Sequence, residues 1–343
     1  LAHTMVETLR QRQPELGVEQ ADVTAVTLAG LCHDLGHGPF SHTWEHLLLP
    51  SLGVNGWKHE DMSCSVLDFI VDQLPDDVAP GEDEVRRIKD MINPKARLAS
   101  PAGGLRRHDA FLYEIVSNTV NNIDVDKFDY LARDSYHCGI RLSFDLSRCM
   151  SGFQVLGSQI CFERSQYQQL HELFHSRQLM HREVYTHRRV AALNLMAADA
   201  LVAAEPHLQL RDTLWDPQLF CELDDTLLRR VEQAPRGGGM SGDVAEAVRR
   251  AGRVVADMRR RRLYPFINEI LVPESETQRL REGEEWQLPS ADEILRHHMG
   301  SVRITCADIV LCRNQISFSQ GRVYPLDNVK FFDSRRDVLG RHV

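Results

Sequence analysis

The side chains best suited to chemistry are concentrated in residues 29–42, which read AGLCHDLGHGPFSH. His33 and Asp34 are adjacent and can grip one ion from either side, although on a helix they diverge by roughly 100°. His37 follows His33 by four residues and would share its helix face. The glycines and proline that come next end the helix, and this break would leave His42 on a turn above the same point.

A His-Asp pair by itself is a weak signal, since one is expected by chance about once in a chain with 16 histidines. This pair follows a mostly apolar helical run and is followed by further histidines. That context favours a metal or phosphate site over a coincidental pair.

A second group of charged side chains lies within residues 118–134. Its four carboxylates are Asp124, Asp126, Asp129 and Asp134. Carboxylates this close repel one another, and their pKa values rise unless a cation or a basic partner is present. If the segment is helical, Lys127 and Tyr130 share one face with the last of the aspartates. The alternative is a helix start whose acidic residues complement the dipole, with Lys127 and Arg133 as ion-pair partners. Because that explains one or two aspartates more readily than four, we interpret the cluster as functional.

Residues 167–204 show the most regular helical pattern in the chain. The residues predicted to face the core are Leu173, Met180, Val184, Ala191 and Leu195. A second stripe on another face consists of Arg177, His181, Tyr185 and Arg188 or Arg189. Basic faces are often only solvated. A line of Arg, His and Tyr without Lys or Glu nevertheless suits an extended anion such as a triphosphate.

The composition is that of a globular protein with a substantial core: 343 residues, 43% of them hydrophobic and 26% charged. The net charge of −9 argues against a mainly electrostatic nucleic-acid binder. Eight scattered cysteines without a C-x-x-C pair predict a reducing intracellular location, nuclear or cytosolic. No apolar run approaches the roughly 18 residues that span a bilayer, so no membrane partner is expected. Because the first residue is Leu1, we interpret the chain as part of a longer protein.

A glycine-rich stretch, residues 234–243, divides the pattern. It lacks the Lys-Ser/Thr of a phosphate loop and is interpreted as a linker between a core, 1–233, and a C-terminal lobe, 244–343. The lobe begins with an arginine-rich helix whose run Arg259–Arg262 either forms a solvated face or meets a nucleotide or nucleic acid. Beyond it, alternation in 302–305 and 316–319 predicts a small sheet. The predicted fold is therefore mainly α, with a small C-terminal α+β region.

Together these residues indicate a reaction class. His33, Asp34 and the distant Asp126 offer mixed nitrogen and oxygen ligands, which suit Fe, Mn or Zn, with Mg possible through the carboxylates. Such an ion activates water and neutralises phosphate oxygens. The histidines that could protonate a leaving oxygen or hold phosphate charge are His37, His42 and His59. On spacing alone, His59 could equally lie on the surface. Metal-assisted hydrolysis of a phosphoester or phosphoanhydride follows as the predicted chemistry.

Five stretches resemble the HD-domain deoxynucleoside triphosphate (dNTP) triphosphohydrolases, in particular the eukaryotic branch that also carries a SAM domain. They are Ala29–His42, Trp57–Glu60, Phe111–Asn118, Ile123–Asp134 and Phe174–His187. They occur in the family's order over most of residues 1–205. The resemblance implies a mostly helical HD fold that cleaves dNTPs to a deoxynucleoside and inorganic triphosphate, and so lowers dNTP pools.

The resemblance also implies roles for individual residues. The metal ligands would be His33, Asp34 and Asp126, with Mg accompanying the substrate phosphates. His42 would protonate the 5′-oxygen, and His37 and His59 would lie on the phosphate side. Asp124 falls on an active-site acidic position, and Lys127 and Arg177 match phosphate contacts. The sugar and base, held closely enough to exclude a 2′-hydroxyl, would contact Tyr130, Asp134, His181 and Tyr185.

Regulation by GTP or dNTP activators and assembly into a dimer or tetramer are implied as well. The matching activator-site residues are Asp145, Arg148, His187, Arg188 and Arg261. Glu163 and Ser165, however, stand where the family has Arg and Lys, and a one-residue shift would bring Arg164 into place. The family's first ligand histidine, a phosphate-binding arginine, the SAM domain and the first part of the activator site are expected before Leu1.

Two other functions compete with this reading. One is an HD phosphodiesterase that acts on other nucleotides. The other is a catalytically impaired scaffold that binds nucleotides or, weakly, single-stranded nucleic acid through Arg259–Arg262. The scaffold hypothesis predicts that binding weakens as the salt concentration rises and that the function survives the loss of His33.

Overall fold

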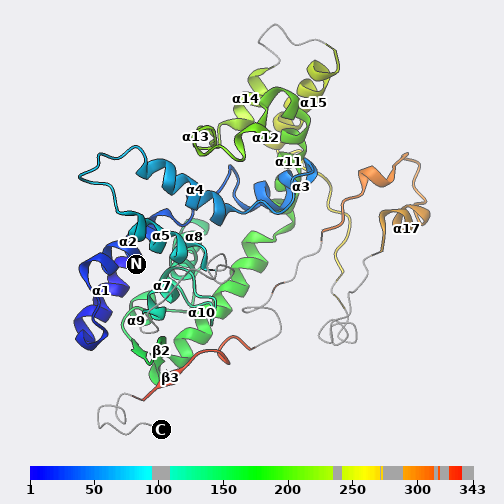
Figure 1. Ribbon diagram of the computed structural model, residues 1–343. Helices are drawn as coiled ribbons and strands as arrows, with labels where there is room; N and C mark the ends of the chain where they lie inside the picture. Colours follow the sequence, from blue (N-terminus) through cyan, green and yellow to red (C-terminus); the bar gives the residue numbers. More distant parts are fainter. Residues whose placement is uncertain are drawn as a thin grey trace.

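The computed structural model describes residues 1–94, 109–234, 242–270, 272, 289–312, 316 and 324–333. The fold is mainly α-helical with one small sheet (Figure 1), which confirms the predicted fold class. The elements up to the sheet are α1 (Ala2–Arg12), α2 (Gln20–Cys32), α3 (Leu49–Ser51), α4 (His59–Val71), α5 (Glu82–Ile92), α7 (Tyr113–Val116), α8 (Val125–Cys138), α9 (Leu146–Cys149), β1 (Phe153–Leu156) and β2 (Gln159–Glu163). Those that follow are α10 (Tyr167–Met180), α11 (Arg188–Leu208), α12 (Leu210–Thr213), α13 (Pro217–Phe220), α14 (Leu227–Gln233), α15 (Gly242–Arg259), α17 (Ala291–Arg296) and β3 (Phe331–Phe332).

The sheet belongs to the helical core and does not lie where the alternating pattern predicted it. β1 and β2 form an antiparallel hairpin, and β3 pairs parallel to β2 with Phe162 opposite Phe331. The predicted strand at 302–305 is wrong. Val302 is 69% exposed, so this alternating segment has no buried face to stabilise it as a strand. Residues 317–319 of the other predicted strand lie outside the described part.

Two hydrophobic clusters stabilise the fold, and α4 belongs to both. The first joins α1, α2, α5, α8, α10 and the sheet around Phe128 and Phe174. The second joins the segment after α2 to α11 and the helices that follow, around Trp44. Met62 of α4 packs in the second cluster and Leu67, little more than one turn later, in the first. The first cluster therefore holds α4 against α2, and the second holds α4 against α11 and the helices that follow.

The long regular segment after the sheet is interrupted. α10 continues as a π-helical turn, His181–Tyr185, and the helix then stops before α11 begins at Arg188. Leu173 and Met180 are fully buried as predicted. The other three predicted core residues, Val184 within the π-helical turn and Ala191 and Leu195 after it, are only half-buried. The break at residues 186–187 changes the helix direction, so one heptad pattern does not describe both halves.

The arginine-rich helix α15 packs along α11 and α14 (Figure 1). Its residues Ala251 and Val255 lie in the second hydrophobic cluster with Leu201 of α11. Residues 235–241 of the predicted linker lie outside the described part, so the division at 234–243 stays a prediction. Within the described ranges, no helix combines the length and the apolar character needed to cross a bilayer.

Candidate metal and phosphate site

A tight turn after α2 carries the His-Asp pair. The helix ends at Cys32, so the prediction that His33 and His37 share a helix face is wrong. The turn is pressed against α4: a Cβ on Gly36 would lie 2.1 Å from the His59 carbonyl oxygen and 2.3 Å from the Ser63 nitrogen. The Gly36 N–H donates to Ser63 Oγ at 2.8 Å, and that hydroxyl donates to the His33 carbonyl at 2.6 Å. A glycine is therefore required here, and the turn is locked to α4.

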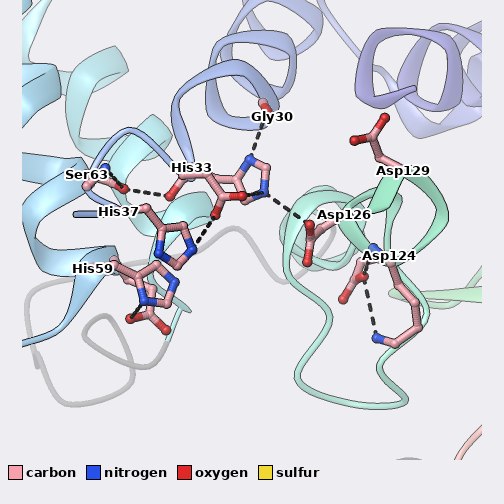
Figure 2. Close-up of polar contacts among 12 residues, drawn as sticks. Gly30, His33, His37, His59, Ser63, Asp124, Asp126 and Asp129 are labelled. Carbon is pink, nitrogen blue, oxygen red and sulfur yellow. Dashed lines mark hydrogen bonds and ion pairs between the residues drawn. The ribbon is translucent and has the colours of Figure 1, made fainter. Parts of the chain in front are cut away.

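The three predicted metal ligands come together although Asp126 lies 92 residues after Asp34. His33 Nε2 is 3.3 Å from Asp126 Oδ1 and 3.4 Å from Asp34 Oδ2 (Figure 2). The first turn of α8 presents Asp126 toward the loop after α2. Their ligand atoms all lie within 4.8 Å of one another, a spacing that one metal ion can bridge.

The electrostatics of this group fit a cation. His33 Nδ1 lies 2.9 Å from the Gly30 carbonyl oxygen, to which it donates, so Nε2 is directed at the two carboxylates. Burial lowers the pKa of His33, but the hydrogen bond to Asp126 and the two negative charges outweigh it and raise the pKa to about 9. The same contact holds the pKa of Asp126 below its usual value, against the effect of burial. A site that stabilises a proton this strongly is one in which a divalent ion is also stabilised.

Three further histidines lie beside the metal group. His37 and His59 are stacked with ring centroids 4.0 Å apart, and the ring of His42 stands nearly perpendicular to that of His37 with centroids 5.3 Å apart. His37 Nε2 approaches Asp34 Oδ1 at 3.6 Å, so the two groups share this aspartate. Burial and then the neighbouring His59 lower the pKa of His37 to about 4, and burial and His46 lower that of His42. Crowded imidazoles of this kind gain protons when an anion arrives, which suits the phosphate side of a nucleotide.

Glu45 is a site residue that the sequence reasoning missed. Its carboxylate is buried, and it accepts hydrogen bonds from His59 Nδ1 at 2.7 Å and from Lys58 Nζ at 2.6 Å. Burial raises its pKa, but these two donors outweigh burial and lower the pKa to about 2. The bond fixes the tautomer of His59 and directs Nε2 away from Glu45. An acidic residue beside Trp44 in the short helical run 44–49, which also holds three leucines, was the signal that could have identified it.

The four aspartates near α8 have separate environments. Asp124 caps the helix, since its carboxylate accepts from the backbone N–H groups of Lys127 at 2.9 Å and Asn118 at 3.1 Å. Lys127 is buried and donates to the Asn122 carbonyl at 2.6 Å. Asp129 points away from the metal group, as Figure 2 shows, and pairs with Arg133 at 2.5 Å. The helix-dipole and ion-pair alternative therefore accounts for part of this cluster, and Asp126 alone joins the metal group.

The remaining predicted substrate residues gather next to these. Tyr185 donates to Asp134 Oδ2 at 2.7 Å, and its ring lies 5.1 Å from His181 and 6.3 Å from Tyr130. Burial, then the charges of Arg177, His42 and Lys127, lower the pKa of His181 to about 4. These charges come from α10, the loop after α2 and α8. The stripe predicted on residues 177–185 therefore faces the same region as His42.

One of the two candidates for the fourth member of that stripe, Arg188, does not follow it. The guanidinium of Arg188 lies 5.2 Å from the ring of Phe266, beyond the break in the helix. Among the other predicted activator residues, Asp145 caps α9 and His187 caps α11. Among the described residues, no polar or ring contact joins Asp145 or Arg148 to His187, Arg188 or Arg261. A nucleotide site built from all five stays a prediction.

A cavity of about 610 Å³ opens beside the histidines. One wall is the loop from His37 to Ser41, and the other is the loop from Leu223 to Thr226 between α13 and α14. Phe40 and Ser41 adopt left-handed backbone angles, φ 66° and 48°, which are uncommon for non-glycine residues. The volume is ample for a chain of phosphates beside His37.

Comparison with known proteins adds a family relationship to this geometry. No family model matches the chain. The chain is 34% identical over 333 residues to the deoxynucleoside triphosphate triphosphohydrolase SAMHD1 homolog of Dictyostelium discoideum, covering 97% of this chain and 59% of that protein. It is 32% identical over 258 residues to SAMHD1 of Danio rerio (67% and 42%) and 34% identical over 228 residues to SAMHD1 of Homo sapiens (61% and 36%).

The chain thus spans less than two thirds of the length of each of these relatives. The match to the Dictyostelium protein covers 97% of this chain and therefore includes the segments that carry His33 and Asp126. The chain is therefore related to the HD-domain dNTP triphosphohydrolases.

Proposed function

We propose that the chain carries the active site of a metal-dependent dNTP triphosphohydrolase, which releases a deoxynucleoside and inorganic triphosphate and so lowers dNTP pools. The observation that carries this proposal is the convergence of His33, Asp34 and Asp126 beside a cluster of three histidines, His37, His42 and His59. The names of the relatives supply the substrate class.

His33, Asp34 and Asp126 would hold the ion, and the mixed nitrogen and oxygen donors suit Fe, Mn or Zn. When bound, a divalent ion supplies positive charge to phosphate oxygens and increases the acidity of water. Mg would enter with the substrate phosphates, whose oxygen atoms are the ligands it prefers. The choice of these metals rests on ligand chemistry alone.

The other residues of the site would bind the phosphates and supply the proton for the leaving group. His37 and His59 lie on the phosphate side, where Lys127 and Arg177 add positive charge. His42 gives a proton to the 5′-oxygen as the bond between that oxygen and the α-phosphorus breaks. Its pKa is low in the free protein. The negative charge of a triphosphate raises that pKa, so His42 becomes an effective acid when substrate is present.

The deoxyribose would lie against the group formed by Tyr130, Asp134, His181 and Tyr185, with Asp124 fixing the start of α8 beneath it. The hydrogen bond between Tyr185 and Asp134 holds two of these side chains in place. A sugar held against the half-buried rings of Tyr130 and Tyr185 leaves little room for a 2′-hydroxyl, which would favour deoxynucleotides over ribonucleotides.

The test is the identity of the products. Incubation of the full-length protein with dGTP and Mg or Mn is expected to release deoxyguanosine and inorganic triphosphate in equal amounts, and a chelator is expected to stop the reaction. Release of pyrophosphate or monophosphate would contradict the proposal and would favour a phosphodiesterase or another nucleotide hydrolase.

Regulation is a separate proposal. Activation by GTP or dNTP through Asp145, Arg148, His187, Arg188 and Arg261, together with assembly into a dimer or tetramer, is supported by the family relationship alone. Light scattering with and without GTP and dATP checks it, and an unchanged mass would contradict it. Weak single-stranded nucleic-acid binding is proposed from the run Arg259–Arg262, and a nuclear or cytosolic location is proposed from the scattered cysteines.

A further inference from the structure

His46 is an ionisable residue beside the candidate active site that has no role in the reaction described so far. In residues 42–49, only His42 and His46 are exposed. They lie one turn apart, and their rings are parallel, with an interplanar angle of 1° and centroids 5.4 Å apart. The histidine assigned to protonate the leaving group is therefore paired with a second histidine that faces solvent.

The backbone that carries this pair is firmly held. Between the two histidines, Trp44 is 1% exposed, and a Cβ on Gly38 would lie 2.5 Å from its ring. Leu48 is fully buried in the second hydrophobic cluster. The segment 44–48 is a π-helical turn, a form that occurs frequently at functional sites. Because both neighbours are fixed in the core, the spacing of the two exposed rings is a property of the fold.

The other groups around His42 are occupied. His37 directs Nε2 to Asp34, and His59 donates Nδ1 to Glu45. Neither ring is exposed to solvent as His46 is. Among the described residues, the His42 ring itself has no hydrogen bond or ion pair, and its only ring neighbours are histidines. His42 is itself exposed, and His46 is the one of its three histidine ring neighbours that is exposed as well, so His46 places a solvent-linked imidazole next to His42.

We propose that His46 is a proton relay that recharges His42 after each turnover. The inference rests on the proposed function, since it requires a reaction that consumes the proton of His42. In the chemical step, His42 transfers its proton to the 5′-oxygen as the phosphorus–oxygen bond breaks, and the attacking water releases one proton. Protonated His46 then passes a proton to neutral His42 through one bridging water and takes another from solvent. Over a cycle, both histidines return to their starting states.

The experiment measures triphosphate release from dGTP by the full-length protein in dilute and in concentrated imidazole buffer. In dilute buffer, His46→Ala is expected to lower kcat about tenfold with little change in KM, a smaller loss than the roughly 100-fold or more that a positioned acid contributes. Imidazole, a diffusible proton donor, is expected to restore kcat to near the wild-type value. His46→Gln, which keeps the polar side chain but transfers no proton, should show the same loss and the same rescue.

The matched control is His207→Ala, an exposed histidine near the end of α11, which should leave kcat unchanged in both buffers. A wild-type protein that releases no triphosphate would contradict the proposed function and the relay together. An active wild type with a His46→Ala variant of unchanged kcat, with a loss that imidazole does not relieve, or with a raised KM alone would contradict the relay and leave the proposed function standing.

Discussion

Two aspartates three residues apart on α8 have opposite surroundings. Asp126 faces His33 at 3.3 Å, whereas Asp129 is exposed and pairs with Arg133. The residue types and their local sequence do not distinguish them. The difference arises because residues three apart on a helix point in directions that differ by roughly 60°, and only one direction faces the loop after α2. This pair is therefore a natural control for the metal site.

The metal content of two variants tests that difference. Asp126→Asn removes a ligand charge and is expected to weaken metal affinity by at least about 100-fold, more than the loss of an outer partner. Asp129→Asn should keep the metal content of the wild type. Elemental analysis of the purified proteins provides the measurement. Equal metal content in the two variants would show that Asp126 is not a ligand.

At this scale, the sequence predicted that His33, Asp34 and Asp126 lie together, and the structure brings them together, whereas their binding of a metal stays a prediction. The residues that support this group were not predicted. His33 and Asp34 were recognised by residue type and adjacency, and Asp126 by the acidic cluster together with the family resemblance. Glu45 was missed because its importance depends on burial and on donors 13 and 14 residues later, Lys58 and His59. A contact of that kind forms only when the elements pack.

Among the elements, the turn after α2 depends on the close approach of α4. Gly36→Ala would place a Cβ within 2.3 Å of two backbone atoms of α4, and neither atom can move without moving the helix. We expect a loss of roughly 1–3 kcal/mol in the free energy of unfolding and a lower metal content. Gly81→Ala, where a Cβ meets nothing within 4 Å, should cost less than about 1 kcal/mol. Chemical denaturation checks both, and equal losses would contradict the close approach.

The contact between α7 and the sheet makes stability depend on pH. Glu114 is 8% exposed, and its carboxylate accepts the Ile160 N–H at 2.8 Å. Burial raises its pKa from 4.5 to about 7. The folded protein therefore holds more protons than the unfolded chain between these values. Its free energy of unfolding should fall as pH rises through that window, and the penalty should persist above it.

Glu114→Gln keeps the acceptor and removes the charge, so it should lose this pH dependence. Relative to the wild type, it is expected to gain up to about 3 kcal/mol in the free energy of unfolding between acidic and mildly basic pH. Denaturation curves across the window provide the measurement, with the exposed Glu222→Gln as the control. Parallel curves for Glu114→Gln and the wild type would contradict this role for Glu114.

Element boundaries were harder to predict than element types. The helices that bear Asp126 and Arg177 were expected and are present. The break after Tyr185 was not expected, because residues 186–187 carry no glycine or proline and the apolar spacing continues across them. The strand β2 pairs with residues 331–332, a partner that only the folded chain brings near.

At the scale of the whole molecule, the candidate site lies where two hydrophobic clusters meet. α2 and α8 approach it from the first cluster, and the segment that carries His42 and His46 is anchored in the second. The cavity wall from Leu223 to Thr226 comes from beyond α11. The site is therefore assembled from sequence segments almost 190 residues apart, His37 to Thr226, which explains why local patterns predicted only part of it.

We infer that the site built around His33, Asp34 and Asp126 catalyses the hydrolysis of a dNTP to inorganic triphosphate. The most direct test is triphosphate release from dGTP by the full-length wild type, Asp126→Asn and Asp129→Asn in parallel. We predict triphosphate from the wild type and from Asp129→Asn at rates within about twofold of each other, and a loss of at least about 1,000-fold in Asp126→Asn. Pyrophosphate as the wild-type product, or undiminished triphosphate release by Asp126→Asn, would contradict it.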